Sequence, residues 1–323
     1  MQESKGRLVN LTVAICTYNG EGRIPEVLDA LLQQQKTEGI AWEVLVIDNN
    51  STDGTGKVVS ELMKNWRSDS QLRYIREERK GLAYARIRAI QAAKSQDLVA
   101  FLDDDNIPAL NWVAEAYNFS IENPQAGAYG GNIHFKLDSP PPEYFNEIKV
   151  YLTIYNRGSE AFCYSRSAKA RKVPAGAGCV FRKQAWNQVV PPVDKLLISG
   201  RDPKTLAAGE DAEVLYYLQN TDWEIWHNPK MEIWHHIYPE RLEKAYLLKL
   251  ARGYGLSQHP VRIARYYRWQ RPFVTLLTPL LNLREGIRVL NFYLKNRQEI
   301  PKDFGKACEL EAKLGQFYSP WFR

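Results

Sequence analysis

The feature of this sequence that most constrains its fold is the alternation of apolar runs with helix-like segments over the first hundred residues. The runs LTVAICTY (11–18), EVLVID (43–48), LRYIRE (72–77) and DLVAFLD (97–103) predict β-strands. PEVLDALLQQ and GLAYARIRAIQAAK, which lie between such runs, predict helices. Because near-continuous apolar strands that alternate with helices are typical of a parallel sheet with both faces covered, we expect an α/β fold of this kind.

Polar residues follow three of these strands directly. The first, second and fourth strands end in CTYN, DNNS and DDDN. Ligands of such sheets bind beyond the carboxyl ends of the strands, so these groups should collect at one rim. DDDN sets three carboxylates side by side, and an uncompensated buried charge is costly, so the cluster calls for a cation.

The later part of the chain alternates less regularly. AGAYGGNIHFK (126–136) predicts a strand with a glycine bend, and residues 138–175 resemble a loop more than a second core. AGAGCVFRK (175–183) predicts a strand and GEDAEVLYYLQN (209–220) a helix, and two short aromatic strands, DWEIWH and MEIWHH, follow. From Pro239 onward the pattern indicates helices, including KAYLLKLARGYG and VRIARYYRWQRPF.

Composition is ordinary for a globular protein, with 45% hydrophobic and 25% charged residues, but the charge is unevenly spread. Residues 241–323 hold 16 Lys and Arg against 6 Asp and Glu, and the rest of the chain is net negative. A basic segment suits phosphate or an anionic surface, and equally a solvated helical face.

Four scattered cysteines favour a reducing compartment. The start of the chain lacks a signal-peptide core, and FVTLLTPLLNL (273–283) is too short to cross a bilayer.

Several chemistries could explain the acidic cluster. An EF-hand loop counted from Asp103 fails, since Pro108 and Ala114 stand where Gly and Glu are required. The cluster could cap a following helix, although capping needs only one carboxylate. NGEGRIP (19–25) offers a dinucleotide-binding alternative with Asp48 on a ribose, but Pro25 replaces its third glycine. A divalent cation that bridges a nucleotide diphosphate uses all the acids and is favoured.

An ordered set of motifs resembles the inverting glycosyltransferases of family 2. The set comprises TVAICTYN (12–19), VIDNNSTDGT (46–55), RKGLAYAR (79–86), FLDDDN (101–106), GAGCVFRK (176–183), GED (209–211) and IWHH (233–236). The resemblance implies a GT-A fold with a mostly parallel central sheet flanked by helices, and a helical C-terminal extension. PAGAGCVFRK and GED…WHH are most similar to bacterial enzymes of polysaccharide assembly, such as the cyanobacterial hormogonium-polysaccharide type.

The resemblance also implies a division of the chain. A catalytic domain would occupy residues 1–238, with a nucleotide-binding half at about 8–125 and an acceptor half at about 126–238. Residues 239–323 would form the basic helical extension. The implied activity is transfer of a sugar from a nucleotide-diphosphate donor, UDP-sugar favoured, to a saccharide or lipid-linked saccharide. The alternatives are a non-catalytic nucleotide- or glycan-binding module of the same fold and an NAD-dependent oxidoreductase.

Four residues are assigned to the nucleotide by this resemblance. Thr17 would lie beside it, and Asp48 would accept a hydrogen bond from the base. Arg86 falls where the family's A-R-N arginine approaches the nucleotide, although Ile87 replaces the asparagine here. Asp104 would contact the ribose or a metal-bound water.

Three residues are assigned to a Mn²⁺ or Mg²⁺ ion. Asp105 would be the direct ligand, with Asp103 as the other member of a D-x-D pair. His235 or His236 would complete the site, and only one of them can reach it, since successive strand residues face opposite ways. We choose His235.

The acceptor hydroxyl needs a base on the face opposite the departing diphosphate. Asp211 of GED resembles the family's catalytic base, and Glu210 beside it would hold the acceptor or the geometry. Both acids would also suit the first turn of a helix. Inversion would follow from a single displacement.

The segment RIARYYRWQRPF (262–273) interleaves arginines with aromatic residues. It could bind an anionic membrane surface or simply pack amphipathic helices on the catalytic domain. Since an acceptor on a lipid carrier favours membrane contact, we expect a cytoplasmic enzyme, peripheral at the inner face of the plasma membrane, with no nucleic-acid partner.

Overall fold

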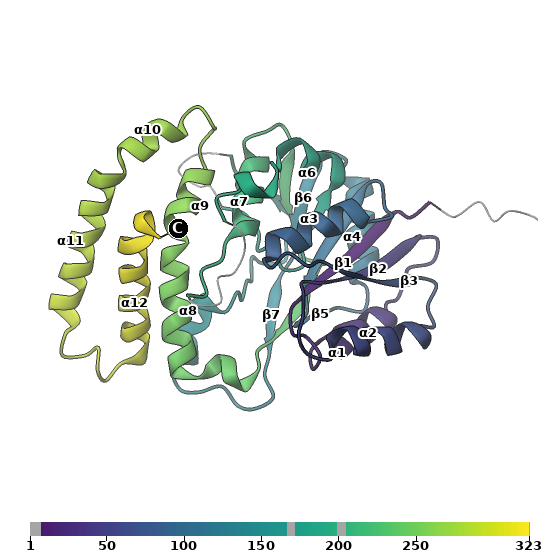
Figure 1. Ribbon diagram of the computed structural model, residues 1–323, viewed down its shortest axis with the longest axis horizontal. Helices are drawn as coiled ribbons and strands as arrows, with labels where there is room; N and C mark the ends of the chain where they lie inside the picture. Colours follow the sequence, from purple (N-terminus) through teal and green to yellow (C-terminus); the bar gives the residue numbers. More distant parts are fainter. Residues whose placement is uncertain (1–7, 167–171, 199–204, 323) are drawn as a thin grey trace, which may run out of the picture.

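The structure, a computed structural model, describes residues 8–166, 172–198 and 205–322 (Figure 1). Within these residues the larger of two sheets has eight strands in the order β3-β2-β1-β4-β9-β6-β10-β8. Its strands are β1 (Leu11–Thr17), β2 (Trp42–Asp48), β3 (Gln71–Arg76), β4 (Leu98–Asp103), β6 (Ala126–Gly130), β8 (Phe162–Cys163), β9 (Val180–Arg182) and β10 (Glu224–His227).

The first four strands run parallel, as their sequence predicts. β1 pairs with β2 and β4, and β3 adds outside β2. β9 is antiparallel to both β4 and β6, whereas β10 is parallel to β6 and β8 runs antiparallel to β10. The expectation of a mostly parallel sheet is confirmed. The register sets Thr17 opposite Asp48 and Cys16 opposite Asp103, so the polar strand ends meet at one rim.

Helices cover both faces of this sheet (Figure 1). The helices on one face are α1 (Ile24–Leu32), α2 (Thr55–Lys64) and α4 (Trp112–Glu122), and those on the other are α3 (Leu82–Ala92), α6 (Lys183–Val189) and α7 (Glu210–Gln219). Strand β1 shows why two cores form: Val13 and Ile15 pack in one cluster, while Ala14 and Cys16 pack in the other. Alternating side chains point to opposite faces, so an apolar run supplies both cores.

A smaller sheet lies next to the acidic cluster. It consists of β5 (Asn106–Pro108), β11 (Ile233–His236) and β7 (Ile133–Lys136), in that order. The expectation of one bent strand over 126–136 is wrong, because β6 and β7 belong to different sheets. Gly131 lies at the break, where an added Cβ would stand 1.7 Å from the Met231 carbonyl oxygen. Within the small sheet His235 pairs with Asn106, which brings the end of β11 to the turn after β4.

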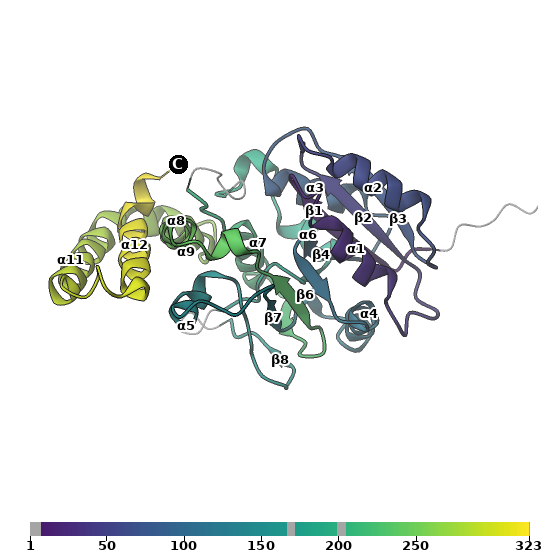
Figure 2. The ribbon, with the colours of Figure 1, turned by 90° about the horizontal axis from the view of Figure 1, so that it is seen from below.

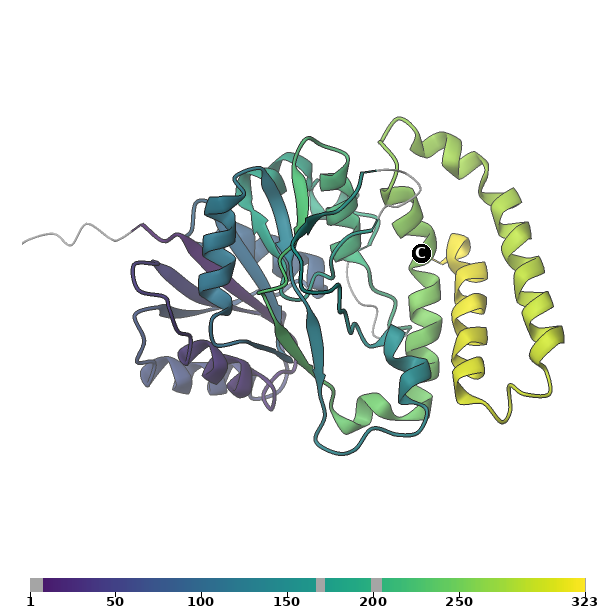
Figure 3. The same ribbon diagram turned by 180° about the vertical axis from the view of Figure 1, so that it is seen from behind.

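The C-terminal part is helical, as expected. Its helices are η3 (Pro239–Leu242), α8 (Lys244–Leu256), α9 (Gln258–Ala264), α10 (Arg271–Leu276), α11 (Thr278–Asn296), α12 (Phe304–Tyr318) and η4 (Ser319–Trp321). Helix α8 lies nearest the sheet, α12 next and α11 outermost (Figures 1 and 3). Figure 2 shows these three helices together at one end of the molecule. Helices α8 and α12 approach closely, since a Cβ on Gly315 would lie 2.2 Å from the Arg252 carbonyl oxygen.

Two expectations about the later chain need correction. The segment expected as a loop contains α5 (Phe145–Ile148) and η1 (Lys149–Tyr151), and its buried apolar side chains share a core with α8 and α12. The segment VRIARYYRWQRPF is not one helix, because α9 ends at Ala264 and α10 begins at Arg271. The remaining helix, η2 (Val193–Lys195), precedes α7. The domain boundary at residue 238 stays a prediction.

Candidate functional site

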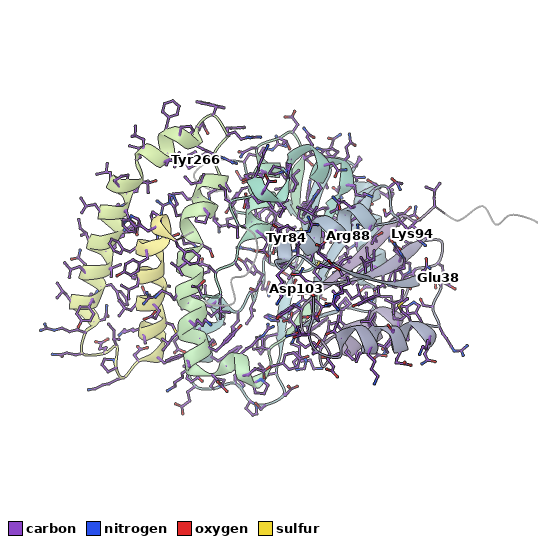
Figure 4. All side chains as sticks on the ribbon, in the orientation of Figure 1. Glu38, Tyr84, Arg88, Lys94, Asp103 and Tyr266 are labelled. Atoms are coloured by element: carbon purple, nitrogen blue, oxygen red, sulfur yellow. The ribbon has the colours of Figure 1, made fainter. Side chains whose placement is uncertain are left out.

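The acidic cluster lies at the rim where the parallel strands end. Asp103 is the last residue of β4, and Asp104 and Asp105 form the turn into β5. Figure 4 shows Asp103 and Tyr84 toward the C-terminal helices, with Glu38 and Lys94 at the far end of the sheet. The structure thus sets the carboxylates at the carboxyl ends of the parallel strands, the end of the sheet at which open α/β folds bind ligands.

Asp104 is held by a hydroxyl and a guanidinium group. Thr17 Oγ1 donates a hydrogen bond to Asp104 Oδ2 over 2.6 Å. Arg23 donates from Nε and Nη2 to the two carboxylate oxygens, at 3.0 and 2.8 Å. Burial opposes the charge of Arg23, but its hydrogen bonds to Asp104 raise the arginine pKa. An added Cβ on Gly20 would lie 2.1 Å from Thr17 Oγ1, so this loop needs a glycine to close over the pair.

Asp105 is buried beside an imidazole and a second guanidinium group. Arg241 Nη1 lies 2.6 Å from Asp105 Oδ2 and 3.1 Å from His235 Nε2. His235 Nε2 is itself 3.6 Å from Asp105 Oδ2, and its Nδ1 lies 2.9 Å from the Leu152 carbonyl oxygen. Burial lowers the pKa of Arg241, but the charges of Asp105 and Asp104 outweigh it and raise that pKa.

The neighbouring histidine faces away from this group. His236 Nδ1 lies 2.7 Å from Glu26 Oε2, and its Nε2 lies 2.9 Å from Asp138 Oδ1. Alternation along β11 therefore sends His235 toward Asp105 and His236 toward α1. The structure places the chosen histidine, His235, beside the acidic turn.

Arg86 connects the acidic cluster to the GED motif. Its guanidinium lies 3.7 Å from Asp103 and forms an ion pair with Asp211 at the start of α7. The side chain is buried, with its guanidinium 5.3 Å from the centre of the Phe101 ring. A Cβ on Gly176 would lie 2.0 Å from Asp211 Cγ, so the GAG motif leaves room for that carboxylate.

Glu210 and Asp211 lie at the N-terminal end of α7, where the helix dipole favours negative charge. Glu210 is buried and its Oε2 accepts a hydrogen bond from the Gly209 backbone at 3.0 Å. Gly209 itself has φ +143°, which a residue with a side chain rarely adopts. The two acids and Arg86 line a crevice together with apolar side chains from Ala83, Ile87, Phe181, Trp186, Val190, Leu196 and Val214.

Asp48 is engaged within the protein. Its Oδ1 accepts a hydrogen bond from the Ser51 backbone at 2.8 Å, and its Oδ2 accepts one from Tyr74 Oη at 2.6 Å. Burial and this hydrogen bond raise the pKa of Tyr74 to about 12, so the phenol donates at neutral pH. The carboxylate lies opposite Thr17 at the rim, so the structure brings it to the end of the sheet where the acidic turn lies.

The donor atoms fit a hard divalent cation that takes some of its ligands from the protein and the others from a bound substrate. Over the described ranges, 8–166, 172–198 and 205–322, no group of three or more His, Cys, Asp or Glu side chains is arranged to hold a metal. Asp105 Oδ2 and His235 Nε2 nevertheless lie 3.6 Å apart, so one ion with bonds of about 2.1 Å could reach both. Mg²⁺ and similar ions typically take one or two protein ligands and complete their shell with phosphate oxygens and water.

Sequence reasoning did not identify Arg23 and Arg241. Arg23 lies in the glycine motif that was weighed as a dinucleotide loop, and Arg241 lies at the start of the basic segment. Neither position carries a local pattern that pairs it with an acid far along the chain. For Arg241 the available signal was the excess of basic residues after residue 240, which indicates no acidic partner, and Arg23 had no such signal.

A family model described as "Glycosyl transferase family 2" matches residues 12–188. TuaG of Bacillus subtilis, a glycosyltransferase assigned to teichuronic acid biosynthesis, is 27% identical over 144 residues, which are 44% of this chain and 54% of TuaG. Glycosyltransferase AglE of Haloferax volcanii is 30% identical over 125 residues, 39% of this chain and 40% of AglE. The matched segments span about half of these relatives.

Two solved structures share the fold. The mannosyltransferase PcManGT from Pyrobaculum calidifontis, in complex with GDP-Man and Mn²⁺, has a TM-score of 0.57 at 18% identity and covers 97% of this chain and 88% of its own. GalNAc-T7 with UDP, GalNAc and Mn²⁺ has a TM-score of 0.52 at 16% identity, over 79% of this chain and 52% of its own. The family model covers more than half of this chain. The protein therefore has the expected GT-A fold and belongs to glycosyl transferase family 2.

Proposed function

We propose that this protein is an inverting glycosyltransferase of polysaccharide biosynthesis. It transfers a sugar from a nucleotide-diphosphate donor, UDP-sugar favoured, to a saccharide or lipid-linked saccharide. The observation that carries the proposal is the pair of contacts made by Arg86, which join Asp103 of the acidic turn to Asp211 of GED. One site thus combines acids for the diphosphate side with a carboxylate for the acceptor side.

The donor side uses the rim of the parallel sheet. Asp105 and His235 would hold Mn²⁺ or Mg²⁺, with Asp103 supporting the turn, and such an ion stabilises charge on a departing diphosphate. Thr17, Asp48, Asp104 and Arg86 would bind the nucleotide. Both structures of the same fold described above contain Mn²⁺ and a nucleotide or nucleotide sugar, which supports a divalent ion here.

The acceptor side uses the start of α7. The oxygen of the acceptor hydroxyl bonds to the anomeric carbon of the donor sugar, and Asp211 takes the proton of that hydroxyl. The bond between that carbon and the diphosphate oxygen breaks in the same displacement, so the configuration inverts and no sugar is attached to the enzyme. Glu210 holds the first turn of α7 through the Gly209 backbone.

Two alternatives have less support. Membership of family 2 disfavours an NAD-dependent oxidoreductase, and Gly20 of the rival motif closes the loop over Thr17 and Asp104. A non-catalytic module needs donor contacts but no base, so the combination of acidic turn and GED favours an enzyme. Within the family we place the chain among bacterial polysaccharide enzymes such as the hormogonium-polysaccharide type, in line with its similarity to TuaG.

Thermal unfolding with candidate donors tests the function. We expect one of the UDP-, GDP- and dTDP-sugars, with UDP-sugar favoured, to raise the melting temperature strongly when Mn²⁺ is present. A ligand at about 100 times its Kd stabilises by about 2.7 kcal/mol, which is easily measured. The matching nucleoside monophosphate is the control, since it lacks the second phosphate. If no nucleotide sugar stabilises the protein or is consumed with any saccharide acceptor, the proposed function is wrong.

We also propose that α10 and α11 lie on the anionic inner face of the plasma membrane, which would place the enzyme in the cytoplasm. Side chains three or four residues apart on α11 are 53% to 67% exposed, and all are large and apolar: Leu280, Leu283, Ile287, Leu290 and Leu294. Phe273 and Leu276 of α10 are exposed as well, and Arg284 and Arg288 lie on α11. Among the described residues no helix is both long and apolar enough to cross a bilayer. An amphipathic basic helix of this kind lies in the interface of an anionic membrane.

Vesicle sedimentation tests this surface. We expect binding to phosphatidylcholine vesicles that contain phosphatidylglycerol, weaker binding without it, and release at high salt. The double variant Leu283→Gln with Ile287→Gln should lose roughly tenfold or more in affinity, because each apolar side chain buried contributes about 1.5–3 kcal/mol. Ile121→Gln, at a 65% exposed position on α4, is the control. If the double variant binds vesicles as well as the unmodified protein does, lipid does not cover this face. The same holds if the unmodified protein is a dimer in solution and the double variant is a monomer, since a second copy of the chain would then cover the face.

A further inference from the structure

Arg241 contacts both side chains that the proposed function assigns to the metal. It comes from η3, which follows β11, and its guanidinium is largely buried. A single nitrogen, Nη1, lies 2.6 Å from Asp105 Oδ2 and 3.1 Å from His235 Nε2. The guanidinium therefore occupies the side of these two atoms that a shared cation would need.

The chemistry of His235 makes the two cations mutually exclusive. The Leu152 carbonyl oxygen can only accept, so His235 Nδ1 carries the hydrogen that it donates over 2.9 Å. In the neutral ring Nε2 then has one lone pair, and in this structure that lone pair accepts a hydrogen bond from Arg241. The same lone pair cannot also bind a metal ion.

Charge leads to the same conclusion. A guanidinium cannot be deprotonated in a protein, and Arg241 Nη1 lies 2.6 Å from Asp105 Oδ2. A divalent ion bound to Asp105 would therefore stand next to a fixed positive charge unless the arginine moves. Arg23 differs, because it bonds Asp104 and the Tyr18 carbonyl oxygen rather than Asp105 or His235.

We propose that Arg241 is an internal competitor of the divalent cation: it holds Asp105 and His235 in the free enzyme and must release both before the metal binds. The inference rests on the metal site of the proposed function. The free enzyme then binds the metal weakly, because each metal ion displaces a buried ion pair and a hydrogen bond. In the free protein Arg241 also offsets the buried negative charge of Asp105.

Titration of Mn²⁺, monitored by the electron paramagnetic resonance signal of the free ion, tests the proposal without nucleotide and without turnover. We expect Arg241→Gln to lower the Kd of Mn²⁺ by about tenfold, since hydrogen bonds to charged groups no longer have to be broken. Arg23→Gln removes the same charge from the same cluster but leaves Asp105 and His235 as they are, so it should change the Kd by less than about threefold. Arg241→Met should behave like Arg241→Gln and serves if the latter does not fold.

The outcomes separate this inference from the proposed function. An unchanged or weaker Mn²⁺ affinity in both Arg241 variants would overturn the competition. So would an equal gain in Arg23→Gln, since the effect would then be one of overall charge. If the protein transfers sugar but binds no Mn²⁺, the proposed function holds and the inference is wrong. Arg241 would then stay on Asp105 in place of a metal ion throughout the reaction.

Discussion

Asp211→Asn should lower the rate of sugar transfer by about a thousandfold and leave donor binding almost unchanged, because a general base contributes about 10²- to 10⁴-fold. The amide has the shape of the carboxylate, so the start of α7 and the space beside Gly176 are kept. It cannot take up a proton at neutral pH, and the acceptor hydroxyl then attacks without help. The loss should appear in kcat, with the Kd of the donor within about threefold of the unmodified protein.

The measurement is initial-rate kinetics together with calorimetric titration of the donor. Asp222→Asn is the control, because Asp222 is exposed just beyond the other end of α7 and its carboxylate forms a 3.9 Å ion pair with Arg166. It should retain full activity. A kcat for Asp211→Asn within tenfold of normal would place the base elsewhere, and complete loss of donor binding would make Asp211 a donor contact.

Asp105→Asn should abolish both Mn²⁺ binding and metal-dependent transfer. The change removes the charge that faces His235 and Arg241 at 3.6 and 2.6 Å. Stabilisation of a departing diphosphate by a metal is worth several kcal/mol, so the rate should fall by at least about a hundredfold. Chelation of metal from the unmodified protein should have the same effect, and added Mn²⁺ should restore activity to that protein alone.

The matched control lies at the opposite end of β4. Asp97 precedes β4 at its opposite end and pairs with Arg182 at 2.7 Å, so Asp97→Asn also breaks an Asp–Arg pair. It should keep its Mn²⁺ affinity, measured by resonance titration, and its rate. Activity that survives both chelation and Asp105→Asn would exclude the proposed metal site and leave a metal-independent enzyme.

The acidic cluster shows what the tertiary structure adds to a prediction made from the sequence. Three neighbouring carboxylates predict a cation, and the structure supplies guanidinium groups from three separate segments. Arg86 pairs with Asp103, Arg23 with Asp104 and Arg241 with Asp105. The repulsion among the three carboxylates of DDDN is thus offset by arginines of the protein itself. A metal ion that binds Asp105 must displace Arg241 from it.

The fold was largely predictable because its signals are local. An apolar run of about six residues between helical segments specifies a strand buried on both faces, and β1 to β4 follow these runs to within a residue or two. The positions of DDDN and GED followed too, since one ends a strand and the other begins a helix. Local patterns gave a wrong prediction where a segment distant in the sequence determines the structure. At Gly131 the close approach of Met231 divides the strand expected over 126–136 between two sheets.

The sequence by itself therefore determined the α/β architecture, the rim on which Thr17, Asp48 and Asp103 gather, and the family. Only the tertiary structure decided which side chains meet there: that His235 rather than His236 faces Asp105, and that Arg86 bridges Asp103 and Asp211. The physical reason is the range of the interactions. Hydrophobic periodicity is set by residues a few positions apart, whereas an ion pair between residues more than a hundred positions apart depends on how whole elements pack.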